Sequence, residues 1–202
     1  MTFAIVPAAG RSTRMGRPKL LLPLGDRTVL EHLLTALHDG GVEHIVVVIG
    51  PDAPELVPLV TAAGATAHLL AEPTPDMRTT VGRGLCWLEE NVRPRPDDVW
   101  LLAPGDHPAI NADTVRAVLA AASRYSIVVP VHEGRRGHPT AIAWRHVPAI
   151  RALPVEVGIN SFLRQQEVFE VPVADPGILT DLDTPEQYAR LSTAAGRRGT
   201  GL

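Results

Sequence analysis

The hydrophobic pattern of the chain alternates between short, continuous apolar runs and longer amphipathic stretches. The apolar runs are rich in β-branched residues, which is typical of strands buried on both faces of a parallel sheet. They lie at residues 3–7, 44–50, 67–71, 98–103, 126–131, 140–144 and 167–173. Apolar residues at helical spacing fill most of the segments between them. The alternation predicts an α/β fold, a three-layer α/β/α sandwich around a mostly parallel sheet.

Local signals indicate where the helices begin. Residues 28–31, TVLE, form a capping box, and the apolar stripe that follows ends at Gly40. A second helix is expected at residues 54–63, a third from about Thr79 onward and a fourth after Asn111. Thr184 as N-cap, followed by Pro185 and by Gln187 three residues after the cap, marks the start of a last helix.

Size and composition narrow the class of protein. With 202 residues and 45% hydrophobic content we expect one domain at residues 1–195 and a flexible tail at 196–202. A net charge of −3 argues against a general nucleic-acid binder. The single cysteine, Cys86, excludes a disulfide framework, and it is expected in a helix core. The pattern also lacks a secretion signal and a membrane span, so we expect a soluble, cytoplasmic protein.

The segment after the first apolar run carries the clearest chemistry. Residues 10–19, GRSTRMGRPK, combine two glycines with four cations, and the first acidic residue is Asp26. Glycines let backbone N–H groups approach phosphate oxygens while cations neutralise their charge, so the loop is suited to a triphosphate. Neither the P-loop sequence nor the dinucleotide-binding glycine pattern is present.

Lys19 is the only lysine among the 19 cationic residues. Its presence in an arginine-rich chain suggests a position that needs a compact ammonium, which a guanidinium fork cannot replace. The alternative is that one lysine falls there by chance.

Acidic residues stand at two further places where ligands bind in α/β proteins. Asp106 follows the strand at 98–103 and so lies at its carboxyl end, where a surface turn is the alternative. Asp181 and Asp183 precede the last helix, where they could instead simply oppose its dipole.

Two polar segments suggest binding without identifying a ligand. Thr79 and Thr80 at a helix start suit a ribose or phosphate, and an ordinary N-cap is equally consistent. Arg135, Arg136 and His138, in the loop HEGRRGHP at 132–139, could recognise an anionic acceptor, or the two arginines could be part of a solvated turn.

Residues 8–23 read A-A-G-x-S-x-R-M-G-x-x-K-L-L-L-P, which resembles the signature of MobA-like nucleotidyltransferases. The molybdenum cofactor cytidylyltransferase branch is the nearest. The segments around Asp106 and Asp183 resemble the family's L-A-D-x-P and D-I-D-T-P-E-D-Y, in the same order. The resemblance therefore implies a Rossmann-like fold of the nucleotide-diphospho-sugar transferase type.

The resemblance also implies roles for individual residues. Mg²⁺ would be held by Asp106 and Asp183, with Asp181 as the alternative to Asp183, and His138 would contact the acceptor. Arg14 and Lys19 would be catalytic. The nucleotide contacts that it implies are Ala8, Ala9, Gly10, Arg11, Ser12, Thr80 and Gly84.

Two segments depart from the family pattern. Asp76 replaces a glycine of the segment that contacts the nucleotide, and Thr80 replaces its serine. Residues 155–163, VEVGINSFL, stand where the molybdopterin branch shows G-D-x-G-A-R, and only Gly158 remains. The second departure weakens the prediction of a molybdopterin acceptor and leaves that of nucleotidyl transfer in place.

The prediction is an enzyme that transfers CMP from CTP to a phosphate-bearing acceptor such as molybdopterin, with release of pyrophosphate. CTP is favoured because Ala8-Ala9 is typical of the cytidylyl branch, whereas guanylyltransferases more often have Gly-Gly there. The resemblance also implies a molybdoenzyme as partner protein. The alternatives are transfer to a sugar phosphate or a phosphonate, and a non-catalytic nucleotide- or cofactor-binding chaperone.

Overall fold

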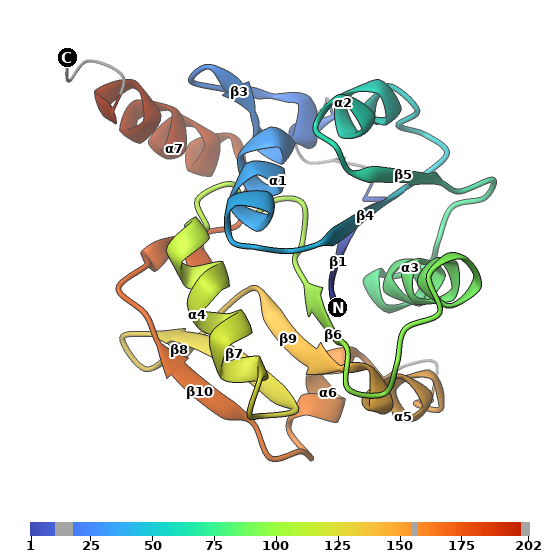
Figure 1. Ribbon diagram of the computed structural model, residues 1–202. Helices are drawn as coiled ribbons and strands as arrows, with labels where there is room; N and C mark the ends of the chain where they lie inside the picture. The colour runs from blue at the N-terminus through green and yellow to red at the C-terminus, as the bar shows by residue number, and fades with distance from the viewer. Residues whose placement is uncertain (11–17, 155–156, 199–202) are drawn as a thin grey trace.

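The computed structural model describes residues 1–10, 18–154 and 157–198 and is built around one large sheet (Figure 1). Its strands, in spatial order, are β10 (Phe169–Pro172), β7 (Ile127–His132), β9 (Thr140–Ala143), β6 (Val99–Leu102), β1 (Thr2–Ala8), β4 (His44–Ile49) and β5 (Thr66–Leu69). The short β8 (Arg135–Arg136) pairs with β7, and β2 (Pro23–Leu24) pairs with β3 (Arg27–Thr28) as a separate hairpin.

The sheet is mostly parallel, which confirms the prediction. β1 is parallel to both of its neighbours, β4 and β6, and β10 is parallel to β7. β9 runs antiparallel to β6 and β7. A continuously apolar strand reads the same in either direction, so the sequence pattern alone could not identify the reversed strand.

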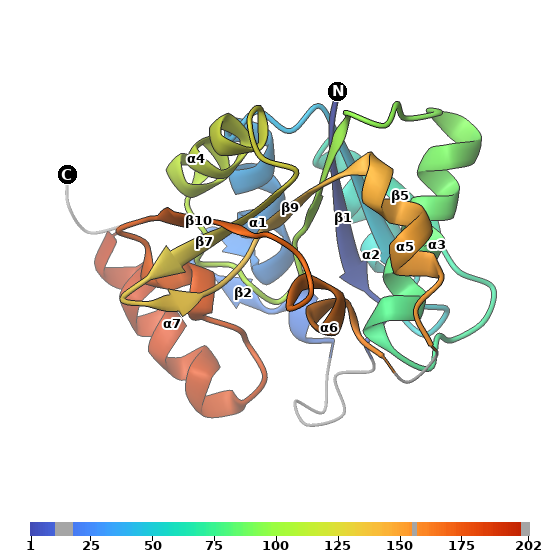
Figure 2. The same cartoon turned by 90° about the horizontal axis from the view of Figure 1, so that it is seen from below.

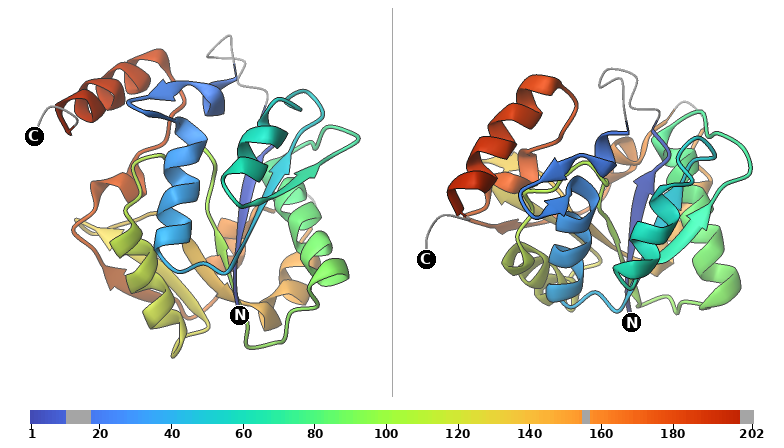
Figure 3. Two further views of the ribbon diagram at one scale, coloured as in Figure 1. Left: turned by 45° about the horizontal axis from the view of Figure 1, so that its top comes forward. Right: turned by 90° about the horizontal axis from the view of Figure 1, so that it is seen from above.

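Helices cover both faces of the sheet, and the three-layer sandwich is confirmed. The helices are α1 (Val29–Asp39), α2 (Leu56–Ala62), α3 (Met77–Asn91), α4 (Ala112–Ala122), α5 (Val147–Arg151), α6 (Ile159–Leu163) and α7 (Pro185–Arg198). Figure 2 shows α1 and α4 on one side of β1 and α3 and α5 on the other. Helix α7 lies beside the hairpin of β2 and β3 (Figure 3).

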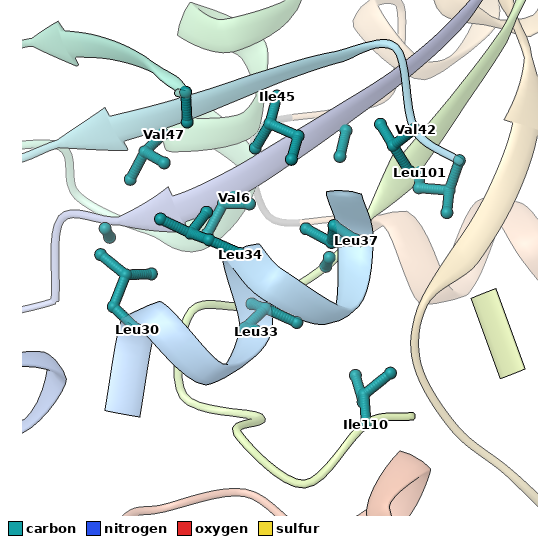
Figure 4. Close-up of a cluster of buried hydrophobic side chains, with 14 of the residues drawn as sticks. Val6, Leu30, Leu33, Leu34, Leu37, Val42, Ile45, Val47, Leu101 and Ile110 are labelled. Carbon is teal, nitrogen blue, oxygen red and sulfur yellow. The ribbon is translucent and has the colours of Figure 1, made fainter. Parts of the chain in front are cut away.

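Alternating residues of β1 separate the two cores. Ala4 and Val6 point to the core beneath α1, whereas Phe3 and Ile5 point to the core beneath α3. The stripe of α1 then buries four leucines against β1 and β4 (Figure 4): Leu30, Leu33, Leu34 and Leu37. Burial of a leucine side chain contributes about 1.5–3 kcal/mol, so this face anchors α1 to the sheet.

The expected helix starts are largely correct, with two shifts. Helix α2 begins at Leu56, two residues after its expected start. Thr28 caps α1 through the predicted capping box with Glu31. The third helix begins at Met77, two residues before Thr79, because the side chain of Asp76 accepts a hydrogen bond from the backbone N–H of Thr79. The residue that departs from the family glycine is therefore the N-cap of α3.

Two further expectations differ from the structure. Cys86 lies on α3 but is exposed, so the prediction of a core cysteine is wrong. The apolar stripe of α3 runs through Val81, Leu85 and Leu88, and position 86 faces away from it. Helix α7 continues to Arg198, three residues into the segment expected to be a tail.

In the part of the chain that the structure describes, no helix is both long and apolar enough to cross a membrane.

Candidate active site

A cavity of about 630 Å³ opens at the carboxyl ends of β1 and β6. Its walls come from four segments, namely the end of β1 with the two residues after it, residues 19–20, the loop after β6, and the start of α3 with the stretch that leads into it. The lining residues of predicted function are Ala8, Ala9, Gly10, Lys19, Thr80 and Asp106. Six of the predicted site residues therefore meet at one cavity.

Lys19 lies in a single turn of 3₁₀ helix, η1 (Lys19–Leu21). The buried Leu20 anchors this turn in the hydrophobic core. Its Nζ donates hydrogen bonds to Oδ2 of Asp106 and to Oδ1 of Asp183, each at 2.7 Å. Only 15% of the Lys19 side chain is exposed. The only lysine of the chain thus joins the two carboxylates that the sequence suggested as metal ligands.

The charges in this cluster stabilise one another. Burial favours a neutral Lys19, but the hydrogen bonds and charges of Asp106 and Asp183 outweigh it and raise the pKa of Lys19 above its ordinary value. Burial would likewise raise the pKa of Asp106, yet hydrogen bonds from His107 and Lys19 hold that pKa well below its usual range. Both groups are therefore charged near neutral pH.

Asp183 reaches Lys19 because the start of α7 is firmly held. Oε1 of Gln187 accepts hydrogen bonds from the backbone N–H groups of Asp183 and Thr184, at 2.7 and 2.8 Å, and Oγ1 of Thr184 accepts one from the N–H of Gln187. These bonds confirm the predicted cap. Leu182, which is fully buried, donates its backbone N–H to the carbonyl oxygen of Asp106 at 2.9 Å.

Asp181 lies elsewhere. Its Oδ1 accepts a hydrogen bond from Nε2 of Gln187 at 3.0 Å, and the residue lines a second cavity. The geometry therefore favours Asp183 over Asp181 as the partner of Asp106.

The donor set fits a magnesium ion. Two carboxylate oxygens converge on one point, and Mg²⁺ is usually bound by one or two carboxylates together with substrate phosphates and water. Among residues 1–10, 18–154 and 157–198, no group of three or more histidine, cysteine or acidic side chains could hold a metal. A cation here would need oxygen ligands beyond these two carboxylates.

Ala9 and Thr80 line the larger cavity and are both held by close contacts. Gly50, at the end of β4, packs so closely on Ala9 that a Cβ at position 50 would lie 3.2 Å from the Ala9 Cα. Thr80 is 3% exposed, and its Oγ1 donates to the carbonyl oxygen of Asp76 at 3.1 Å and lies 2.6 Å from Oγ1 of Thr74. Alanine methyls and a threonine pair thus shape this wall.

Gly84 is not among the residues that line this cavity, and its close packing offers a structural reason for the glycine. A Cβ at this position would lie 2.8 Å from Cγ2 of Ile5 and 3.0 Å from Cγ2 of Val48. The glycine instead lets α3 approach β1 and β4 closely. Arg11, Ser12 and Arg14 lie outside the described residues.

A second cavity, of about 390 Å³, lies on the other side of Asp106. Asp106 lines the first cavity and its neighbour His107 lines the second. The polar residues of the second cavity are His107, Arg135, Arg136, His138, Thr140, Asn160, Arg164 and Asp181. Arg136 is also paired with Glu170, since Nε lies 2.7 Å from Oε1.

His138 is deeply placed in this second cavity. Its ring packs edge-on against that of His107, with centroids 5.1 Å apart. Burial, together with the charge of His107, lowers the pKa of His138 to about 4, so the imidazole is neutral near pH 7. Its buried Nδ1 has no hydrogen-bond partner among the described residues. A buried polar atom of this kind commonly forms a hydrogen bond with a ligand or a water molecule.

Several residues of the site were not anticipated. Nδ1 of His107 lies 3.0 Å from Oδ1 of Asp106, and since an ionised carboxylate can only accept, Nδ1 is the donor. The signal available was a histidine directly after a strand-end aspartate. Asn160 on α6 and Arg164, which directly follows this helix, stand in no recognisable sequence pattern.

Arg78 is a further unanticipated residue, one turn from the cavity. Its guanidinium donates to the carbonyl oxygens of Leu153 at 2.7 Å and Val157 at 3.1 Å, and also to that of Pro154. It therefore ties the first turn of α3 to the segment that leads into α6, which lines the second cavity.

A mostly parallel sheet with a lysine and two carboxylates near the carboxyl ends of its strands is typical of an α/β protein that binds its ligand at this edge. The model of the MobA-like NTP transferase domain matches residues 4–170, and the chain belongs to this family. The matched residues contain Lys19 and Asp106 and end before Asp183. The chain is accordingly a nucleotidyltransferase.

Two curated relatives illustrate the range of the similarity. A nicotine blue oxidoreductase from Paenarthrobacter nicotinovorans is 30% identical over 201 residues, which cover 93% of this chain and 94% of the relative. The bifunctional protein GlmU from Mycolicibacterium paratuberculosis is 34% identical over 139 residues, or 63% of this chain. This match spans only 27% of the length of GlmU.

Solved structures match over almost the whole chain. The Rv0371c homologue from Mycobacterium sp. strain JC1 has a TM-score of 0.82 at 27% identity and covers 98% of both chains. A nucleotidyl transferase from Methanothermobacter has a TM-score of 0.78 at 25% identity, covering 98% of this chain and 99% of its own. Rv0371C from Mycobacterium tuberculosis, solved in complex with manganese, has a TM-score of 0.72 at 25% identity and covers 96% and 98%.

Proposed function

We propose that this chain is a Mg²⁺-dependent cytidylyltransferase that moves CMP from CTP to a phosphate-bearing acceptor such as the molybdopterin cofactor. The observation that carries the proposal is the convergence of Lys19, Asp106 and Asp183 at the wall of the larger cavity. One cation and two carboxylates at a strand end form a centre suited to phosphoryl chemistry.

The larger cavity would take the nucleotide. Gly10 and Lys19 lie on its wall and would approach the phosphates, together with Arg14. Ala8, Ala9 and Thr80 would contact the nucleoside, where the methyl groups favour a pyrimidine. One methyl in a pocket discriminates by about 1–3 kcal/mol, so we expect a preference for CTP and not an absolute selection.

The smaller cavity would take the acceptor. His138 lines this cavity together with the side chains of Arg135, Arg136 and Arg164. Arginine recognises phosphate oxygens through paired N–H donors, so an anionic acceptor is favoured over a neutral one. Because Asp106 and His107 are adjacent and line different cavities, the two substrates would meet at this strand end.

In the reaction, an oxygen of the acceptor phosphate attacks the α-phosphorus of CTP in line and pyrophosphate leaves. Asp106 and Asp183 would hold Mg²⁺, which when bound neutralises charge on the phosphate oxygens. Lys19 and Arg14 would stabilise the negative charge that shifts toward pyrophosphate. A phosphate monoester is largely ionised near neutral pH, so no protein base is required for the attack. Residues 1–195 would act as one catalytic domain.

Calorimetric titration of CTP, GTP, ATP and UTP with Mg²⁺ tests the nucleotide assignment. CTP should bind most tightly, and pyrophosphate release should then require an acceptor that carries a phosphate monoester. A preference for GTP would contradict the cytidylyl assignment. Failure to bind any of the four nucleotides would favour a cofactor-binding chaperone. Turnover with sugar phosphates or phosphonates in place of molybdopterin would change the proposed acceptor but not the proposed reaction. The proposal of a molybdoenzyme partner would then lose its support.

A second candidate function follows from the relative named as an oxidoreductase, which matches over 93% of this chain. Redox enzymes commonly take hydride from a reduced nicotinamide. Incubation with NADH or NADPH and a dye acceptor, followed by absorbance, tests this candidate directly. We expect no oxidation of the nicotinamide, and sustained oxidation would replace nucleotidyl transfer as the proposal.

A further inference from the structure

Lys19 occupies the position between the two carboxylates where a divalent cation is expected. Both hydrogen bonds start from the same nitrogen and have the same length, 2.7 Å. Oδ2 of Asp106 and Oδ1 of Asp183 are therefore no more than twice that distance apart. Oxygens that share a magnesium ion lie roughly 3–4 Å from each other when each is 2.0–2.1 Å from the metal.

The ammonium and a metal ion cannot share this position. A cation bound to both oxygens would fall within contact distance of Nζ, where two positive charges repel strongly in a half-buried site. Lys19 must therefore release at least one carboxylate before both can bind a metal.

The Lys19 ammonium has an alternative binding position next to the two carboxylates. Its side chain lines the larger cavity together with Gly10, so the ammonium borders the space assigned to the triphosphate. Phosphate oxygens would offer it acceptors that match the carboxylates in charge.

We propose that Lys19 is a built-in substitute for the divalent cation, which holds Asp106 and Asp183 together in the nucleotide-free protein and releases them when phosphate oxygens draw it away. The site then binds its divalent cation together with the nucleotide and binds it weakly alone. The role of the nucleotide rests on the function proposed above, whereas the exclusion between Lys19 and the cation does not.

Two other features support this role. Removal of Lys19 would leave the negative charges of two neighbouring carboxylates less neutralised, which favours the binding of a cation from solution. Two protein carboxylates are also too few to hold Mg²⁺ alone, and phosphate oxygens complete its shell in nucleotide sites. The cation and the triphosphate thus need each other, and Lys19 enforces that requirement.

The experiment measures Mn²⁺ binding by calorimetry and by electron paramagnetic resonance, with and without a non-hydrolysable CTP analogue. The variants are Lys19→Met, Lys19→Arg and, as control, Arg124→Met. Arg124 is exposed near the amino end of β7, whereas the site lies at the carboxyl ends of β1 and β6, and its substitution changes the net charge equally.

For the wild-type protein we expect weak Mn²⁺ binding alone and much tighter binding with the analogue. Lys19→Met should bind Mn²⁺ alone about tenfold more tightly or better, since a close positive charge is removed. Its melting temperature should fall by roughly 3–6 °C without metal and recover when Mn²⁺ is added. Lys19→Arg and Arg124→Met should both bind Mn²⁺ alone as weakly as the wild type.

The proposal would be overturned if the Lys19→Met variant bound Mn²⁺ no more tightly than the Arg124→Met variant. It would also be overturned by wild-type protein that binds the analogue and yet binds Mn²⁺ equally well with and without it, a comparison that needs no variant. If the analogue itself does not bind while Lys19→Met still gains Mn²⁺ affinity, the nucleotide function fails and the exclusion by Lys19 stands. If the analogue binds and Lys19→Met gains no Mn²⁺ affinity, the nucleotide function stands and the exclusion by Lys19 fails.

Discussion

The backbone N–H of Leu182 donates a hydrogen bond to the carbonyl oxygen of Asp106 at 2.9 Å, and this bond joins the loop after β6 to the start of α7. Leu182 is fully buried, so the joint is anchored in the core. The next residue, Asp183, is thereby held beside the ammonium that also binds Asp106.

Substitution of the two carboxylates should separate their role from that of Asp181. Asp106→Ala should lower the rate of Mg²⁺-dependent pyrophosphate release by about 10²–10³-fold or more, and Asp183→Ala by somewhat less. The control, Asp181→Ala, should retain more of this rate than Asp106→Ala, because the Asp181 carboxylate accepts a hydrogen bond from Gln187 and lines the cavity assigned to the acceptor. Near wild-type turnover by Asp106→Ala would end the metal assignment, and loss in Asp181→Ala with activity in Asp183→Ala would move the second ligand.

Lys19→Arg should lose nearly as much turnover as Lys19→Ala. The Lys19 Nζ satisfies two carboxylates at 2.7 Å from a side chain that is mostly buried, and a planar guanidinium is wider than this gap. Steady-state rates of CTP-dependent pyrophosphate release provide the measurement. Comparable turnover by the arginine variant would show that positive charge alone is sufficient.

Gly84→Ala should destabilise the protein without altering nucleotide affinity. The added methyl group would meet Ile5 at 2.8 Å, and overpacking of this kind costs about 1–3 kcal/mol. Gly82→Ala is the matched control on the same helix, because a Cβ there meets nothing within 4 Å and alanine favours helix by about 1 kcal/mol. Urea unfolding and calorimetric CTP titration of both variants check this. Weaker CTP binding by folded Gly84→Ala would restore a role at the nucleotide.

His138 should make the stability of the protein depend on pH. Its pKa is lowered to about 4 in the folded protein from about 6.5 in the unfolded chain, so the unfolded state binds more protons between these values. The free energy of unfolding should therefore fall by about 2 kcal/mol more between pH 7.5 and pH 5 in the wild type than in His138→Gln. Urea unfolding at these two pH values is the measurement, and equal losses in both proteins would contradict the burial of a neutral imidazole.

Local signals in the sequence were sufficient for most of the fold and for part of the site. The cap formed by Thr184 and Gln187 needs only four residues, so it could be predicted from spacing. The contact of Lys19 with two carboxylates depends on chain segments far apart, and spacing carries no information about it. Gly84 shows the limit most clearly, since a glycine required for packing and one required for a ligand look the same in sequence. Arg78 donates hydrogen bonds to backbone carbonyl groups, which every residue has. The identity of its partners therefore leaves no recognisable pattern in the sequence.

Asp106 and His107 lie between the two cavities, because each of these neighbours lines a different one. The remaining walls of the two cavities are supplied by different parts of the chain. Residues after β7 and on α6 build one side, and residues after β1 and before α3 build the other. Substitutions on one side can therefore reshape one compartment while the other keeps its form, which gives the scaffold a means to change one substrate at a time.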